Sequence, residues 1–192
     1  MISGWQSALS FLLAAVAQAA AAQALAPAEL MRQLAQAESV QATFVETRYS
    51  ALLKEPLVLR GTLIYRRPAF LEKHVQQPYD ERVALDGDVL TMQNRRGRKL
   101  TTSASGSPAI AGLVEGIRAT RAGDLAALER HFAILVDGQL ERWSMSLKPT
   151  DADLARHVAA IVFSGSHKRI ARVEVRETGG GRAVMEIDEE IK

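Results

Sequence analysis

Short segments in which apolar and polar residues alternate, each ended by a turn signal, fill most of the chain beyond residue 57. The first, LVLRGTLIYRR, places Leu57, Leu59, Leu63 and Tyr65 on one face of an extended strand. Gly61 on the same face predicts a bulge or a close backbone approach. The turn signals are Pro68, Gln77-Pro78, Asp86-Gly87, Asn94 to Gly97, Asp137-Gly138, Ser164-Gly165 and Gly179 to Gly181. This spacing predicts about ten or eleven strands in hairpin succession, forming an antiparallel sheet that curls into a barrel or half-barrel.

Two segments have helical spacing instead. Residues 26–40 repeat apolar positions every three to four residues, with Pro27 at the first helical position. Residues 107–131 read as a helical hairpin set inside the strand series, with Ser107 as a cap, a break at Gly123 and Asp124 capping a second short helix. The concave face of a long curled sheet must be covered or filled, so these helices either close an apolar cavity or complete the core. Periodicity alone does not decide between these two roles of the helices.

The first 28 residues contain no charged side chain, since the earliest is Glu29. An apolar run from Ala8 to Ala17 passes into small residues that match an A-x-A cleavage pattern, although the usual basic residue before the run is missing. We therefore expect residues 1–24 to be a secretory signal peptide, cleaved near Ala22 or Ala24. The alternative, a membrane anchor, is disfavoured because the apolar run is short. Residues 25–192 are expected to form a single domain.

The chain has no cysteine. Disulfides, thiol catalysis, cysteine-ligated metals and lipid attachment to an N-terminal cysteine are therefore excluded. An exported, cysteine-free protein of this size fits the periplasm of a Gram-negative bacterium.

Few residues indicate a catalytic, metal-binding or nucleic-acid-binding site. The net charge is +2, which does not indicate a nucleic-acid partner, and the basic run from Asn94 to Lys99 reads as a solvated hairpin tip. The four histidines lack metal-ligand spacing, and Asp151 and Asp153 read as an exposed turn. No nucleophile elbow, phosphate loop or dinucleotide motif is present. We expect no enzyme activity, no cofactor and no metal.

Several landmarks resemble one family. GTLIYRRPAFLEK followed by QPYDERVALDGDVLTMQ, with Gly61, Arg67-Pro68, Gln77-Pro78 and Asp86-Gly87, is similar to the conserved region of the periplasmic outer-membrane lipoprotein carriers, the LolA family. VQATFVET is similar to the first strand of that family. The resemblance implies an unclosed antiparallel β half-barrel with a helical lid and an apolar cavity for acyl chains. It also implies cargo received from an inner-membrane exporter and passed to an outer-membrane acceptor, with the carrier acting as a monomer.

The resemblance also assigns roles to residues. The arginine of the Arg-Pro pair, Arg67 with Pro68, is expected to gate the lid by hydrogen bonds. Arg67 lies on the same face of its strand as the apolar residues. Its guanidinium N–H groups can donate to the free carbonyl oxygens at the end of a helix. The expected lining of the cargo cavity comprises Phe44, Leu57, Leu59, Leu63, Tyr65, Leu90, Met92, Ile110, Leu113, Val114, Ile117, Trp143 and Met145.

The sequence departs from the family where Glu72 and Lys73 replace an aromatic-rich strand. The cargo is therefore left open between lipoprotein acyl chains and other lipid-like or polyene chains. Two rival functions also remain. One is a lipoprotein-sensing module of an envelope-stress pathway, and the other is a small hydrolase or isomerase, which would need polar groups that the expected lining does not provide.

Overall fold

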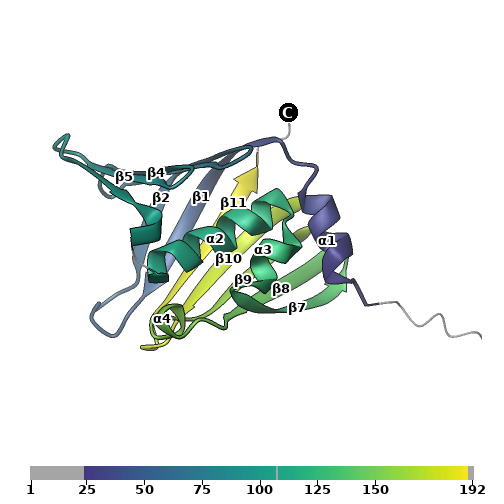
Figure 1. The fold of residues 1–192 in the computed structure, drawn as a ribbon. Coiled ribbons are helices and arrows are strands. Elements are labelled where there is room, and N and C mark those ends of the chain that lie inside the picture. The colour runs from purple at the N-terminus through teal and green to yellow at the C-terminus, as the bar shows by residue number, and fades with distance from the viewer. Residues whose placement is uncertain (1–23, 107, 190–192) are drawn as a thin grey trace, which may run out of the picture.

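One antiparallel sheet of eleven strands forms the body of the protein (Figure 1). The computed structural model describes residues 24–106 and 108–189, without the side chains of residues 108–110 and 113. The strands are β1 Ser39–Tyr49, β2 Leu57–Arg66, β3 Phe70–Gln77, β4 Glu81–Asp86, β5 Val89–Asn94, β6 Lys99–Ser103, β7 Phe132–Gln139, β8 Arg142–Pro149, β9 Val158–Ser166, β10 Arg169–Glu177 and β11 Arg182–Glu189. The number of strands and the antiparallel half-barrel agree with the prediction from the sequence.

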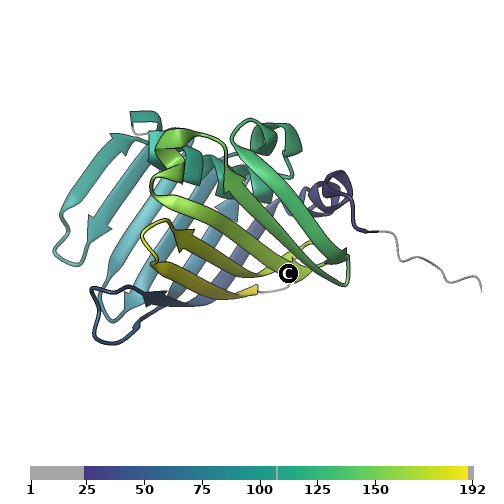
Figure 2. The ribbon, with the colours of Figure 1, turned by 90° about the horizontal axis from the view of Figure 1, so that it is seen from below.

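The sheet is not closed. Its spatial order is β6-β5-β4-β3-β2-β1-β11-β10-β9-β8-β7, so β1 lies at the centre beside β11, and β6 and β7 are the two edges. Seen from below, the sheet bends between these edges with the longer helices on its inner side (Figure 2). Because β6 and β7 follow one another along the chain, the segment that joins them has to reach from one edge of the sheet to the other.

The helices occupy the concave side of the sheet. They are α1 Pro27–Leu34, the 3-10 turn η1 Ala104–Gly106, α2 Pro108–Ala122, α3 Leu125–Glu129 and α4 Ala152–Ala155. We call α2 and α3 together the lid. The side chain of Asp124 accepts from Ala127 N and caps α3, as predicted, and Gly123 between the helices has φ of +72°. The predicted cap at Ser107 lies outside the described residues.

The segment that contains Asp151 and Asp153 differs from the prediction. It was expected to form an exposed turn, but the structure contains the short helix α4, whose first turn is capped by Asp151 through Asp153 N and Leu154 N. The burial of Leu154 explains the helix, because its side chain packs against Gly112 of α2. Among the described residues, no helix has the length and apolarity needed to cross a membrane.

The core is unevenly distributed over the inner face of the sheet. The main cluster of buried side chains packs α1 and α3 onto β7 to β10, and includes Leu30, Leu128, Phe132 and Ile161. The other half of the sheet has only two small clusters, one around Phe44, Leu59 and Val75 and one around Leu85, Leu90 and Ala104. The space between the lid and this second half is therefore less completely filled.

A close backbone approach at Gly61 generates the first prediction. A Cβ at this position would lie 1.8 Å from His74 O and 3.0 Å from Phe44 Cε1, at the point where the β2–β3 register shifts. We expect Gly61→Ala to lower the free energy of unfolding by about 2 kcal/mol, measured by urea denaturation. Gly179→Ala is the control, since nothing lies within 4 Å of its Cβ. Equal midpoints for the two variants would contradict this account of Gly61.

Candidate functional site

A cavity of about 750 Å³ lies between the inner face of the sheet and the lid. Its wall is formed by side chains of β1 to β5 and of β9 to β11, together with α2, which crosses over the strands (Figure 1). Most of the exposed wall is apolar. The loop between β1 and β2 borders it through Tyr49, Leu52 and Leu53, and Leu52 is 94% exposed to solvent. An apolar cavity of this size suits a small amphiphilic or apolar ligand.

Six of the residues expected in the cavity lie on its wall. They are Leu57, Leu63, Tyr65, Leu90, Val114 and Ile117. The first three alternate along β2, and α2 presents Val114 and Ile117 at helical spacing, so the two periodicities place both sets on facing surfaces.

Other expected residues lie elsewhere. Phe44 and Leu59 are buried together with Val75 in the small cluster, and Trp143 and Met145 are buried in the main core. The inner face of β8 is covered by packed helices, so Trp143 and Met145 fill space there and do not border the cavity. Met92 of β5 is half-buried but is not a lining residue. The side chains of Ile110 and Leu113 lie outside the described residues.

The sequence analysis did not identify the wall formed by the central strands. The additional apolar lining residues include Val40, Ala42, Val173, Val175, Met185 and Ile187. Each belongs to an alternating run, in VQATFVET, RVEVRE or AVMEIDE. The alternation could therefore have identified these residues as lying on one face of a strand. The sequence did not show that β1 pairs with β11, which sets these runs beside each other.

The wall also carries charges, contrary to the expectation that it would supply no polar group. Glu46 of β1 is only 3% exposed. It accepts from Arg48 Nε at 2.5 Å and forms an ion pair with Lys73 Nζ of β3. Lys73 also lies 5.1 Å from the centre of the Phe44 ring. The lysine that departs from the family pattern is thus neutralised within the cavity wall.

Burial and pairing compete at this cluster. Burial alone would raise the pKa of Glu46, but Lys73 and Arg48 outweigh burial, and the pKa lies below its ordinary value. Burial lowers the pKa of Lys73, and Glu46 only partly offsets that effect. The Glu46 carboxylate is therefore the ionised member on which the two cations depend.

Arg67 connects the sheet to the lid. Its Nη2 donates to the carbonyl oxygen of Ala122, the last residue of α2, at 3.0 Å. Its backbone N–H donates to Glu38 O at 3.0 Å, and β2 ends at Arg66, before Pro68. Arg66 is exposed and stacks on Phe70, with its guanidinium carbon 4.2 Å from the ring centre. A second interaction holds the last turn of α2 to the sheet, because Arg121 forms an ion pair with Glu189 of β11.

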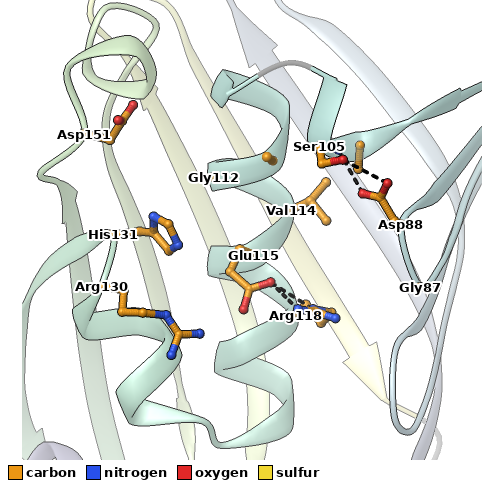
Figure 3. Close-up of a pocket in the computed structure, with 12 residues that line it drawn as sticks. Gly87, Asp88, Ser105, Gly112, Val114, Glu115, Arg118, Arg130, His131 and Asp151 are labelled. Carbon is orange, nitrogen blue, oxygen red and sulfur yellow. Dashed lines mark hydrogen bonds and ion pairs between the residues drawn. The ribbon is translucent and has the colours of Figure 1, made fainter.

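A second, polar pocket of about 560 Å³ lies beside α2 and η1 (Figure 3). Asp88 accepts from Ser105 N and Ser105 Oγ, both at 2.9 Å, and its backbone carbonyl accepts from Ala104 N at 2.8 Å. Hydrogen bonds from Ser103 and Ser105 lower the pKa of Asp88. On α2, Glu115 and Arg118 pair with each other. These bonds hold η1 to the β4–β5 hairpin, so we assign this cluster to fastening the start of the lid. Among the described residues, no group of His, Cys, Asp and Glu could hold a metal.

An unclosed half-barrel with a helical lid over an apolar cavity is the architecture of a binding protein for apolar molecules. The model of the family described as outer membrane lipoprotein carrier protein LolA-like matches residues 19–184. The chain belongs to this family, and the resemblance inferred from the sequence is confirmed. The family description is that of a carrier and not of an enzyme.

Several solved structures are similar to this chain. A LolA superfamily protein, NE2245 from Nitrosomonas europaea, has 8% identity and a TM-score of 0.49, over 88% of this chain and 94% of that one. MucB from Pseudomonas aeruginosa, solved with MucA, has 12% identity and a TM-score of 0.47, over 86% and 57%. A lipoprotein-sorting protein domain from Vibrio parahaemolyticus has 12% identity and a TM-score of 0.44, over 85% and 90%. No curated protein sequence matches the chain.

The depressed pKa of Glu46 predicts how acid acts on the fold. A carboxylate whose folded-state pKa lies below the unfolded value stabilises the protein above the unfolded pKa and loses that effect as the pH falls through the folded pKa. We expect Glu46→Gln to lower the free energy of unfolding at pH 7 by about 2 to 3 kcal/mol, because it leaves Lys73 and Arg48 without their partner. The difference from wild type should shrink as the pH is lowered below the ordinary carboxyl pKa of 4.5.

The matched control is Glu186→Gln, which breaks an exposed pair with Arg172. Its cost should stay below about 1 kcal/mol. Denaturation curves at neutral and acidic pH give both values. A Glu46→Gln penalty that does not change with pH would contradict the assignment.

Proposed function

We propose that this protein is a periplasmic carrier, which binds acyl or other lipid-like chains in the cavity and shuttles them toward the outer membrane. The observation that carries the proposal is the apolar cavity beneath the lid. A straight chain of methylene groups fits such a wall, since each buried CH₂ contributes about 0.8 kcal/mol. Binding of this kind needs no catalytic group, so the protein acts by uptake and release.

Release requires the lid to move away from the sheet. In the proposed mechanism, Arg67 gates the cavity through its single bond to Ala122 O, and Pro68 fixes the backbone just beyond the arginine. One exposed, charge-assisted hydrogen bond is a weak restraint. Together with the Arg121–Glu189 pair it holds the last turn of α2, while the Asp88 cluster holds the start of the lid. The closed state is thereby secured by a few bonds that cargo exchange can break.

The cellular route is part of the same proposal. Residues 1–24, of which 1–23 lie outside the described residues, would be a leader removed near Ala22 or Ala24, leaving a single monomeric domain from residue 25 onward. The cargo would come from an inner-membrane exporter and pass to an outer-membrane acceptor. It would be either a lipoprotein or another lipid, including polyene chains.

The proposal is tested by isolating the protein from a periplasm and identifying bound molecules by native mass spectrometry and lipid extraction. We expect an acyl or polyene species to co-purify. Leu63→Asp should abolish it, because a carboxylate on the cavity wall opposes apolar cargo. Leu135→Asp is the control, as Leu135 is 70% exposed and lies outside the cavity.

A protein that is isolated without lipid and does not bind a fluorescent acyl probe would contradict the carrier function. The rival is then a protein-binding sensor. The MucB structure described above is of a complex with another protein, MucA. A pull-down with periplasmic domains of membrane proteins would address that alternative.

The gate is tested by Arg67→Met. Loss of the bond to Ala122 O should make amides in the last turns of α2 exchange with solvent roughly five-fold faster, and should speed probe release by a similar factor. Hydrogen exchange followed by mass spectrometry and stopped-flow fluorescence provide the two rates. Arg66→Met, which removes an exposed arginine that stacks on Phe70, should change neither. Equal behaviour of the two variants would remove Arg67 from the gate.

A further inference from the structure

Two buried hydrogen-bond donors on the cavity wall have no partner. Tyr65 is 3% exposed and Arg121 is 8% exposed, and both line the cavity. The Tyr65 hydroxyl and Arg121 Nη1 lack a hydrogen bond to any described protein atom. Buried polar groups are almost always paired, so two in one apolar cavity call for an explanation. Thr120 Oγ1 is also unpaired, but Thr120 does not line the cavity.

The surrounding contacts fix where these donors lie. Arg121 is in the last turn of α2, and its Nη2 donates to Glu189 Oε1. The same carboxylate oxygen also accepts from Ile170 N at 3.3 Å, which ties it to β10. The guanidinium carbon lies 6.0 Å from the centre of the Tyr65 ring. One edge of the guanidinium is thus held by the sheet, while the remaining nitrogen and the neighbouring phenol oxygen are covered by protein and have no acceptor in the closed state.

The charge balance indicates what these donors can accept. Glu189 neutralises Arg121. Elsewhere the lining holds three acidic and three basic residues and so has no net charge; they are Glu46, Glu72 and Glu177 with Arg48, Lys73 and Arg182. The Tyr65 hydroxyl and Arg121 Nη1 can both donate a hydrogen bond, whereas a bound cation would need groups that accept one. A cation therefore does not fit these two donors. The complementary ligand group is an oxygen acceptor on an otherwise apolar chain, and it need not carry a charge.

We propose that Tyr65 and Arg121 form a polar anchor that becomes accessible when the lid moves and then binds the carbonyl oxygen of an acyl chain entering the cavity. This inference rests on the proposed carrier function and narrows its cargo to chains with an ester, amide or carboxylate oxygen at the anchor. Purely hydrocarbon chains lack the acceptor. Because Arg121 belongs to the lid and Tyr65 to the sheet, movement of the lid uncovers both donors, and a carbonyl bound by both would link the lid to the sheet.

The test compares three ligands of similar length on the purified, delipidated protein: dodecanoic acid, methyl dodecanoate and tetradecane. Affinities are measured by displacement of a fluorescent apolar probe. Tyr65→Phe should weaken binding of methyl dodecanoate by roughly 3- to 10-fold and leave tetradecane unchanged. Arg121→Lys keeps a charge for Glu189, removes the free nitrogen and should weaken the ester by roughly tenfold. Tyr79→Phe, a tyrosine outside the cavity lining, is the matched control.

The comparison of acid and ester distinguishes a neutral carbonyl group from a carboxylate as the bound group. A loss for both acid and ester identifies a carbonyl anchor, and a loss for the acid alone identifies a carboxylate as the ligand. Equal losses for all three ligands would overturn the anchor. Failure of wild type to bind any of the three would instead contradict the carrier function itself. Removing an unpaired buried hydroxyl does not cost a hydrogen bond, so an unfolding curve of Tyr65→Phe without ligand should match wild type and exclude misfolding.

Discussion

The structure depends on one topological constraint: the two edge strands of the open sheet are consecutive along the chain. The segment between β6 and β7 therefore has to reach from one edge of the sheet to the other, and it does so as α2 and α3. It crosses the concave side because its apolar side chains are buried there, so strand order and burial together place a cover over the cavity. The centre of the sheet, where β1 pairs with both β2 and β11, is the rigid base against which that cover closes.

Uneven packing turns this cover into a lid over a site. Gly116 lets α2 approach Phe132, since a Cβ would lie 2.8 Å from Cζ of that ring. On this side α1 and α3 complete the core with Leu30 and Leu128. On the other side, α2 faces the sheet across the cavity and is held at its ends by polar contacts. The lid is thus fixed by apolar packing on one side and by a few polar contacts on the other, which is the basis for the proposed opening of the cavity.

Much of this arrangement could be read from the sequence, because period-two alternation bounded by turn residues is a local signal for strands. Parity placed Leu57, Leu63 and Tyr65 on the inner face of the sheet, but it placed Leu59 there equally, and Leu59 is buried in a small cluster. Parity could not show that the inner face of β8 lies under packed helices, so Trp143 and Met145 were assigned to the cavity and lie in the core. Glu46 and Lys73 share the parity of apolar neighbours, but the register sets Glu46 opposite Leu59 and Lys73 opposite Leu63. Their ion pair therefore depends on the reach of the lysine side chain, which no sequence pattern shows. The lack of a hydrogen-bond partner for the Tyr65 hydroxyl and Arg121 Nη1 depends on side-chain positions, which a sequence pattern does not predict.

The most direct measurement of the central claim, that an acyl chain lies between the sheet and the lid, is photolabelling. A dodecanoyl chain with a terminal diazirine would be bound, irradiated and located by peptide mass spectrometry. The account predicts labels on inner-face residues of β2, β10 and β11, such as Leu63, Val173 and Ile187, and on Val114 or Ile117 of the lid. Labels confined to exposed apolar residues outside the cavity, such as Leu100 and Leu135, or no saturable labelling, would contradict it.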